Sequence, residues 1–478
     1  DPTLYTKLPK NNIADVDLTN ASISIRKSFT VNITSNKLAS AVSCGGRESF
    51  IAFDEERYSL IRSDGNTEPL DASDFQFSDS RTLQIYNLGA NDTEAQLVTT
   101  VKQLKPKAKE KLLEKVNSII VTKSTTEGSG IGTTTFNDGL EYGTFPWGTR
   151  VQDEVISLNT PDVLNIHGVF ESSDTGNPSA PKMVLSSLTS NSTTTSELLM
   201  GEKLIGQVSN AVAIVAEKIS NSASEIAYIT KNDNTFKSGE EVVFQESKVR
   251  GTITSLTAPS FNISANYKFT TGQESTFYDY GTIKRKADSD TPKKRIKIYF
   301  KNGYYATTDD GDITTVNSYK EWNYADDIKK VNGVRNSDII DIRPRVSDYT
   351  VASTSTRSPL EFYGRSFDGA GNSAGSILAS DEAINITYSN YLGRIDRIFL
   401  TKDGKFQIKY GQPAEQPERP SPVTDAIELA TITLPPYLYT PEQANIRFME
   451  HKRFRMKDIK KLENRIKNLE YYTALSVL

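Results

Sequence analysis

The sequence predicts a mainly β protein, built of several small antiparallel domains of sandwich or barrel type and followed by a C-terminal α-helix that starts a coiled coil. Short runs with period-two alternation, such as "RYSLIRSDGN" and "QLVTTVKQL", recur between turn residues, which is typical of antiparallel strands with one wet face. Asn-Gly and Asp-Gly pairs supply the positive φ angles of tight hairpin turns. Near the C-terminus, apolar residues instead recur every three or four positions, which is the spacing of a helix.

The composition limits the classes of partner. A chain of 478 residues is expected to form several cores, because domains typically have about 100–200 residues. A formal net charge of -4 gives no general attraction to nucleic acid or to an anionic membrane, and no apolar run approaches the ~20 residues that cross a bilayer. We therefore expect neither nucleic acid nor a membrane as a partner.

The single cysteine, Cys44, cannot form an internal disulfide or a thiolate zinc site alone. We expect no cofactor and no metal. The chain opens with Asp1 and Pro2 rather than with Met, so we expect it to be a piece of a longer protein.

The sequence of the N-terminal third predicts two structural segments. Residues 1–45 are expected to form an arm or attachment segment, and residues 46–150 a β-sandwich-like domain. Within the second, "TTEGSGIGTTT" (125–135) has the spaced glycines of a phosphate loop. A phosphate loop needs a helix directly after it, because the helix N-terminus meets the anion, and a run of Thr follows here instead. We interpret this stretch as a surface loop.

Residues 151–270 are expected to form a β-domain with an internal repeat. "GEKLIGQVSNAVAIV" (201–215) aligns without gaps to "GEEVVFQESKVRGTI" (239–253), and the two share Gly-Glu, two apolar positions, Gln and Ser at an offset of 38 residues. Each copy predicts a strand, a polar turn and a second strand. The pair therefore predicts two stacked hairpins.

Residues 271–435 are expected to form a further β-domain. Its clearest signals are the Asn-Gly pair at 302–303 and the Asp-Gly pair at 403–404, each of which predicts a hairpin turn. Prolines are concentrated in "QPAEQPERPSPV" (412–423), a composition that favours extended chain and marks a boundary.

The last segment, residues 436–478, is expected to contain a helix whose apolar seam mediates self-association. The seam consists of Ile459, Leu462, Ile466, Leu469, Tyr472 and Leu475. The first four stand at spacings of three, four and three, as the a and d residues of heptads do. A helix that lies on its own β-domain is the alternative. The narrow seam and its place after a proline-rich stretch favour self-association, and Ile at a with Leu at d favours dimers in isolated parallel coils.

Residues with catalytic or metal-binding potential are few. His167 and His451 are the only histidines, and no nucleophile elbow accompanies them, so a Ser-His-Asp site is not expected. Asp309, Asp310 and Asp312 offer oxygen ligands but lack the spacing of a calcium loop, and we interpret them as a tight turn. We expect no enzyme. A pair of carboxylates for glycoside cleavage stays open, because any two acidic residues ~5–9.5 Å apart would serve.

Four segments carry a resemblance to a known family. They are "GTRVQDEVISLNTPDVLNIHGVFES" (148–172), "DIIDIRPRV" (338–346), "YLGRIDRIFLTKDGKFQIKYGQPAEQP" (391–417) and "MKDIKKLENRIKNLEYYTALS" (456–476). In this order they resemble large virion structural proteins of contractile-tailed bacteriophages, cyanophages included. The resemblance implies a tail component, a baseplate or fibre-connector protein made in the host cytoplasm, which docks other tail, baseplate or fibre proteins and forms a homotrimer. It carries over no catalytic motif.

Two other functions are weighed against this one. A receptor-binding protein would read host-surface glycans through the aromatic-rich loops at 276–281, 318–327 and 361–367, although we prefer to interpret these aromatics as core or interface residues. A tail-associated polysaccharide hydrolase is the third hypothesis.

Overall fold

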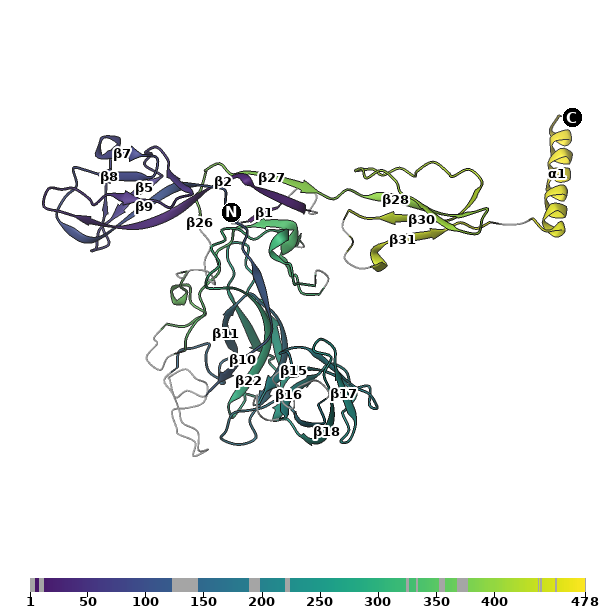
Figure 1. Cartoon of the computed structure of the whole chain (residues 1–478), viewed down its shortest axis with the longest axis horizontal. Coiled ribbons are helices and arrows are strands. Elements are labelled where there is room, and N and C mark those ends of the chain that lie inside the picture. The colour runs from purple at the N-terminus through teal and green to yellow at the C-terminus, as the bar shows by residue number, and fades with distance from the viewer. Residues whose placement is uncertain are drawn as a thin grey trace. The chain divides into compact units, whose positions relative to one another are not determined.

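The computed structural model describes residues 5–7, 13–122, 145–188, 198–219, 224–323, 326–331, 334–351, 357–367, 377–436, 438, 441–451 and 454–477. The described chain is mainly β, with several antiparallel sheets and one C-terminal α-helix, so this part of the predicted fold class is confirmed, whereas the coiled coil stays a prediction (Figure 1). The chain divides into two compact units, Asp1–Ser389 and Asn390–Leu478. Within the described residues, no helix is long and apolar enough to span a membrane. The glycine-spaced loop at 125–135 lies outside the described residues.

A seven-stranded antiparallel sheet organises the first part of the first unit. Its strands are β26 (Ile377–Leu378), β2 (Ile13–Ile33), β9 (Asp92–Leu104), β5 (Tyr58–Ile61) and β6 (Thr67–Glu68) in this order, with β27 (Asn385–Asn390) paired to β2 and β4 (Glu48–Phe50) paired to β9. Beside it are η1 (Ala72–Asp74) and a sheet of β3 (Val42–Ser43), β8 (Thr82–Ile85) and β7 (Phe75–Asp79).

The predicted N-terminal arm is wrong over its described part. Strand β2 pairs with β9 along most of its length, and its alternating residues Ile23 and Ile25 are buried in the same core as Leu60 and Leu97. The period-two pattern of β2 supplies one apolar face to this core, so residues 13–45 belong to the domain that follows them.

A sandwich of two antiparallel sheets follows. One sheet has the order β10 (Lys111–Val121), β22 (Ile296–Tyr305), β12 (Val163–Glu171), β19 (Phe261–Asn262), and the other β11 (Val155–Pro161), β21 (Tyr280–Arg285), β20 (Tyr267–Thr270). Their shared core includes Leu158, Ile283 and Phe300. Because β10 pairs with β22, the predicted domain at 46–150 does not hold together as one body.

The hairpin predicted at 302–303 is wrong. Strand β22 runs unbroken through both residues, with Asn302 opposite Glu114 on one side and Val163 on the other. Gly303 serves close packing instead of a turn, because a Cβ atom there would lie 2.9 Å from the ring of Trp322. Pairing on both sides outweighs the local turn signal of Asn-Gly.

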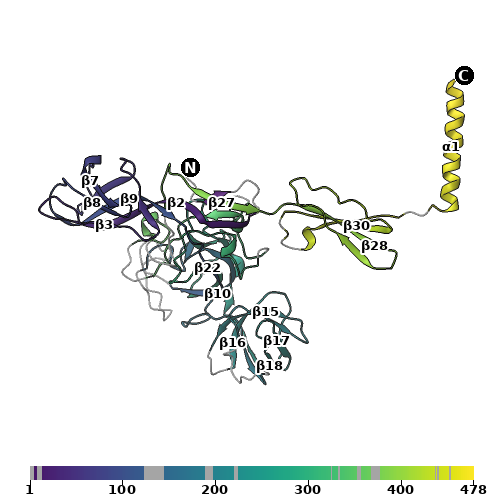
Figure 2. The same cartoon turned by 45° about the horizontal axis from the view of Figure 1, so that its top comes forward.

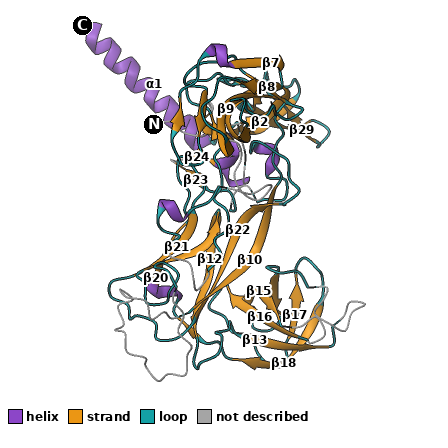
Figure 3. Cartoon of the chain, turned by 90° about the vertical axis from the view of Figure 1, so that its left-hand side faces the viewer, coloured by secondary structure: helices purple, strands orange, loops and turns teal. Residues whose placement is uncertain are grey.

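A closed six-stranded barrel is inserted between β12 and β19 (Figure 3). Its strands close in the order β13 (Lys182–Ser186), β16 (Glu225–Thr230), β15 (Val212–Lys218), β14 (Lys203–Gly206), β17 (Glu241–Phe244), β18 (Arg250–Thr257). The two repeats are the hairpins β14–β15 and β17–β18, as predicted, and β14 pairs with β17. Where the chain enters and leaves the barrel, the backbone N–H of Ser260 donates to the carbonyl of Ser179 at 3.0 Å.

The two repeats hold each other through buried glutamates. Glu202 of the first copy accepts a 3.0 Å hydrogen bond from the backbone N–H of Ser247 in the turn of the second copy. Glu240 of the second copy accepts a 2.9 Å bond from the N–H of Ser209 in the turn of the first. The shared Gly-Glu and Ser positions of the repeat are therefore the two ends of one reciprocal contact.

Short elements complete the first unit. They are the two-stranded pairs β1 (Tyr5–Lys7) with β25 (Ile339–Asp341) and β23 (Lys330–Val331) with β24 (Val334–Arg335), and the 3-10 turns η3 (Ser264–Asn266), η4 (Val316–Ser318), η5 (Asn336–Asp338) and η6 (Phe362–Gly364).

The second unit contains a four-stranded sheet and the helix. The sheet order is β29 (Phe406–Lys409), β28 (Arg394–Thr401), β30 (Ala426–Leu434), β31 (Asn445–Phe448), with η7 (Pro441–Gln443) before β31, and the helix is α1 (Met456–Val477). The predicted hairpin at 403–404 is present between β28 and β29, with Gly404 at φ +73°. A single domain at 271–435 is wrong, because β26 and β27 pair with β2 and the second unit begins after Ser389.

Candidate functional site: the C-terminal helix and its sheet

Helix α1 forms from sequence that strongly favours a helix. Its 22 residues include no Gly and no Pro, and they span about 33 Å at 1.5 Å per residue. At the start, the side chain of Asp458 accepts a 3.1 Å bond from the backbone N–H of Arg455, which satisfies a donor that the helix leaves open. Along the surface, Lys467 and Glu463 form an i,i+4 ion pair at 2.7 Å, which supports the helix locally.

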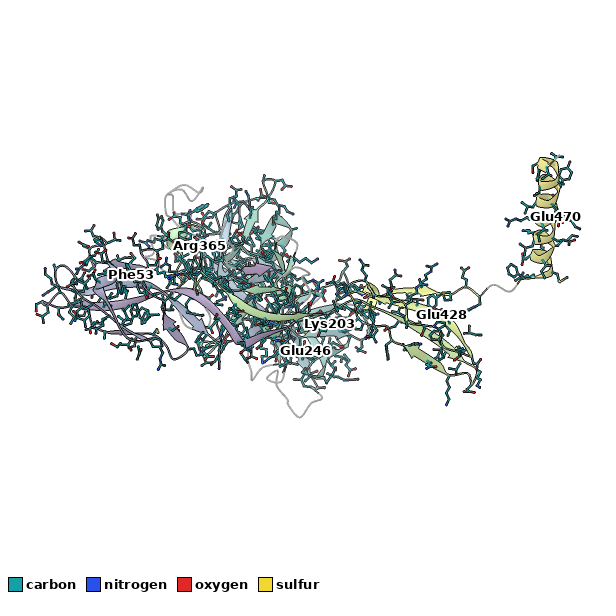
Figure 4. All side chains as sticks on the ribbon, turned by 90° about the horizontal axis from the view of Figure 1, so that it is seen from above. Phe53, Lys203, Glu246, Arg365, Glu428 and Glu470 are labelled. Carbon is teal, nitrogen blue, oxygen red and sulfur yellow. The ribbon has the colours of Figure 1, made fainter. Side chains whose placement is uncertain are left out.

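All six predicted seam residues are exposed. The exposed fractions are 48% for Ile459, 41% for Leu462, 55% for Ile466, 68% for Leu469, 66% for Tyr472 and 58% for Leu475. No described residue of α1 is buried, and its side chains stand free around the helix, as the labelled Glu470 does in Figure 4. The described part of the chain therefore leaves the seam uncovered, whereas self-association through it stays a prediction.

The sheet of the second unit has two unlike faces. Register places nine apolar residues on one of them, which we name the bare face: Ile398, Leu400, Phe406, Ile408, Ile427, Ala430, Ile432, Ile446 and Phe448. Phe406 and Phe448 are each 75% exposed. Figure 2 shows the labelled strands β28 and β30 in a single layer.

The opposite face is covered by the proline-rich segment. Arg397 donates to the carbonyl of Pro420 at 2.7 Å, and Lys409 donates to Ser421 at 2.6 Å. Phe399 is only 1% exposed and lies on this face, with the guanidinium of Arg397 5.2 Å from the centre of its ring. The stretch at 412–423, predicted as a boundary, therefore packs on the sheet. Sequence reasoning missed the bare face, although the alternation of Phe406 and Ile408 signals it.

The two histidines have structural contacts. His167 is largely buried, its Nε2–H donates to the carbonyl of Lys115 at 2.8 Å, and its Nδ1 accepts from Lys231 at 2.9 Å. Burial, with Lys231 nearby, lowers the pKa of His167 to about 4, so the ring is neutral at pH 7. His451 lies exposed beside the carbonyl of Glu428, before the start of α1 at Met456.

Buried charges in the first unit are paired. Lys111 and Asp162 lie 2.7 Å apart, and Arg343 and Asp341 lie 2.6 Å apart, with every one of the four side chains at most 1% exposed. Tyr278 donates to Asp341. Burial raises the pKa of Asp341, but the charge and hydrogen bonds of Arg343 outweigh it and hold the pKa below its ordinary value. Such pairs are typical of structural ion pairs.

The aspartates at 309–312 form hydrogen bonds and ion pairs with other residues of the chain. Asp309 accepts backbone N–H bonds, Asp310 pairs with Lys107, and Asp312 lies 3.2 Å from Arg47. Within the described residues, no group of three or more His, Cys, Asp or Glu side chains is placed to hold a metal ion.

The aromatic-rich loops differ in exposure. Tyr278 and Tyr280 are buried, as are Tyr319 and Trp322, which agrees with the preferred interpretation of these loops as core. In the third loop Phe362 is 64% and Tyr363 80% exposed.

Comparison with known proteins gives one family. The model of a domain of unknown function, DUF4815, matches residues 344–478, which include the whole sheet of the second unit and α1. No curated protein and no solved structure matches the chain.

Proposed function

We propose that this chain is a structural subunit of a bacteriophage tail, a baseplate or fibre-connector protein that assembles as a homo-oligomer through α1 and docks other tail proteins in the virion. The observation that carries the proposal is the exposed seam of α1. The resemblance of four segments to virion structural proteins of contractile-tailed phages supports the choice of assembly.

The seam favours assembly on energetic grounds. Helices in proteins gain most of their stability from packing of an apolar face, and α1 has none of its residues buried. Full burial of one Leu or Ile side chain contributes roughly 1.5–3 kcal/mol. The five Ile and Leu residues of the seam are 41% to 68% exposed, so their burial between sister helices would stabilise an assembly.

We propose a trimer. The Ile and Leu pattern alone favours dimers in isolated parallel coils, but the seam has only about two heptads, and a large β body can override the preference of so short a coil. The family resemblance to trimeric fibre-bearing parts supports three copies.

Sedimentation equilibrium of the intact chain tests the proposal. We expect three times the chain mass of 53.0 kDa. A double change of Leu462→Lys and Ile466→Lys places charge in the seam and is expected to yield single chains. The matched control, Asn464→Lys with Asn468→Lys, adds the same charge to the outer face and is expected to keep the oligomer. A single chain of unchanged sequence, in solution and in the assembled particle, would contradict the proposal.

A receptor-binding role is the second candidate, because Phe362 and Tyr363 are exposed beside Phe277, whose ring lies 6.5 Å from that of Phe362. Exposed aromatic faces stack on sugars. A glycan array probed with the full chain tests it, with Tyr363→Ala as the variant expected to lose the signal and the buried Tyr280→Phe as the control. Absence of any sugar signal leaves the connector role as the sole proposal.

A further inference from the structure

We propose that the bare face of the β29-β28-β30-β31 sheet packs against the same face of other copies of this chain, so that sheet and helix form one continuous interface. This inference rests on the proposed assembly through α1. It adds a second surface, upstream of the helix, and names its partner as a sister sheet.

The exposed apolar area of the bare face equals that of the largest apolar patch on an ordinary monomer, and such patches are often functional. Phe406 and Phe448 alone leave about 300 Å² exposed, since a buried aromatic side chain covers roughly 150–250 Å². With Ile408, Ile427 and Ile446, each about half exposed, the total reaches on the order of 500 Å². The largest apolar patch on an ordinary monomer is about 300–600 Å², and a stable interface needs about 800 Å² from each partner. The bare face together with the seam supplies such an area.

The charges permit packing of like on like. None of the nine residues of the bare face carries a charge. At its end, Arg394 and Asp396 neutralise each other at 2.9 Å. Identical surfaces that meet must avoid like charges opposite one another, and this face meets that condition.

Chain continuity brings the sheets together. Only seven residues separate Phe448 at the end of β31 from Met456 at the start of α1. Such a segment spans at most about 25–30 Å. Helices that associate therefore hold their sheets at an effective concentration in the millimolar range, where a weak apolar face suffices for contact. The family match at 344–478 includes both elements.

Site-specific cross-linking in the full chain tests the contact. With Cys44→Ser to remove the natural thiol, Ile446→Cys is treated with a bis-maleimide of about 10 Å, the spacing of packed sheet faces. We expect covalent oligomers at roughly tenfold the yield of the control Arg447→Cys, which lies one residue on and faces the opposite side of the sheet. Phe448→Cys, on the bare face, repeats the test should Ile446→Cys fold poorly.

The outcomes separate this inference from the proposed function. An oligomer by mass in which Ile446→Cys cross-links no better than Arg447→Cys overturns the sheet contact and leaves the helix assembly intact. A chain that stays single overturns both. Cross-linking of Ile446→Cys to Leu462→Cys within one doubly changed chain would show the helix covering the face, and would also overturn the inference.

Discussion

The inserted barrel and the C-terminal sheet dispose of their apolar residues in opposite ways. The barrel closes on itself, so Phe244 at the end of β17 is 0% exposed, whereas Phe406 at the start of β29 is 75% exposed. Closure also removes free strand edges, and the reciprocal glutamates fix the two repeats. The sheet covers one face with its own proline-rich segment and leaves the other bare. The barrel thus encloses its own core, whereas the sheet and helix leave exposed the surface on which the proposed assembly depends.

Truncation of matched phenylalanines gives the largest expected difference. Phe244→Ala should lower the free energy of unfolding of the barrel by about 3–5 kcal/mol, because it leaves a cavity in a closed core. In the single chain that carries Leu462→Lys and Ile466→Lys, Phe406→Ala should change the free energy of unfolding of the sheet by less than about 1 kcal/mol, because the ring is already in water. Hydrogen exchange of the amides of each sheet measures both. An equal loss at Phe406 would show that the chain covers this face itself.

Removal of a reciprocal carboxylate comes next. Glu240→Ala leaves the backbone N–H groups of Lys237, Val208 and Ser209 without their acceptor. The change should lower the free energy of unfolding in urea by about 2–4 kcal/mol. Its neighbour Glu241 has a half-exposed side chain and a loose 3.6 Å ion pair, so Glu241→Ala should cost under about 1 kcal/mol. Similar losses of stability for the two variants would mean that the reciprocal contact between the two repeats does not stabilise the barrel.

Acid should act on the first unit through His167. The pKa of His167 is about 4 in the folded chain and 6.5 ordinarily. As the pH falls between these values, the unfolded chain therefore binds a proton at His167 that the folded chain does not bind. Stability is therefore full above pH 6.5 and declines toward pH 4, by up to about 3 kcal/mol. Thermal unfolding of His167→Gln between pH 7 and pH 5 should show a flatter pH dependence, whereas His451→Gln, at an exposed site in the second unit, should follow the unchanged chain. Identical slopes for all three would exclude His167 as the cause.

Sequence periodicity predicted elements better than it predicted what lies against them. The repeat at 201–215 and 239–253 could be predicted because Gly-Glu and Ser recur. The sequence alone does not show that Glu202 accepts a hydrogen bond from the turn of the other copy. The Asn-Gly pair at 302–303 misleads for the same reason, since pairing to β10 and β12 decides its conformation.

The candidate site shows the same limit. Spacing identified the seam from Ile459 to Leu475, because helix geometry fixes which residues share a side. Its exposure depends on the absence of neighbours, which spacing does not report. The bare face went unnoticed because its residues come from four strands, and only register brings Ile408, Ala430 and Phe448 into one row.

The barrel's entry and exit strands have a consequence for evolution and engineering. Ser179 and Ser260 are joined by a backbone bond, and directly outside them Phe170 and Asn262 pair across β12 and β19. The barrel also packs on its host sheet, where Ala227 and Ile229 share a buried core with Phe170, and Glu217 pairs with Lys297 at 2.7 Å. A module that replaces the barrel can therefore enter and leave at this point, but it must cover the same apolar patch of the host sheet.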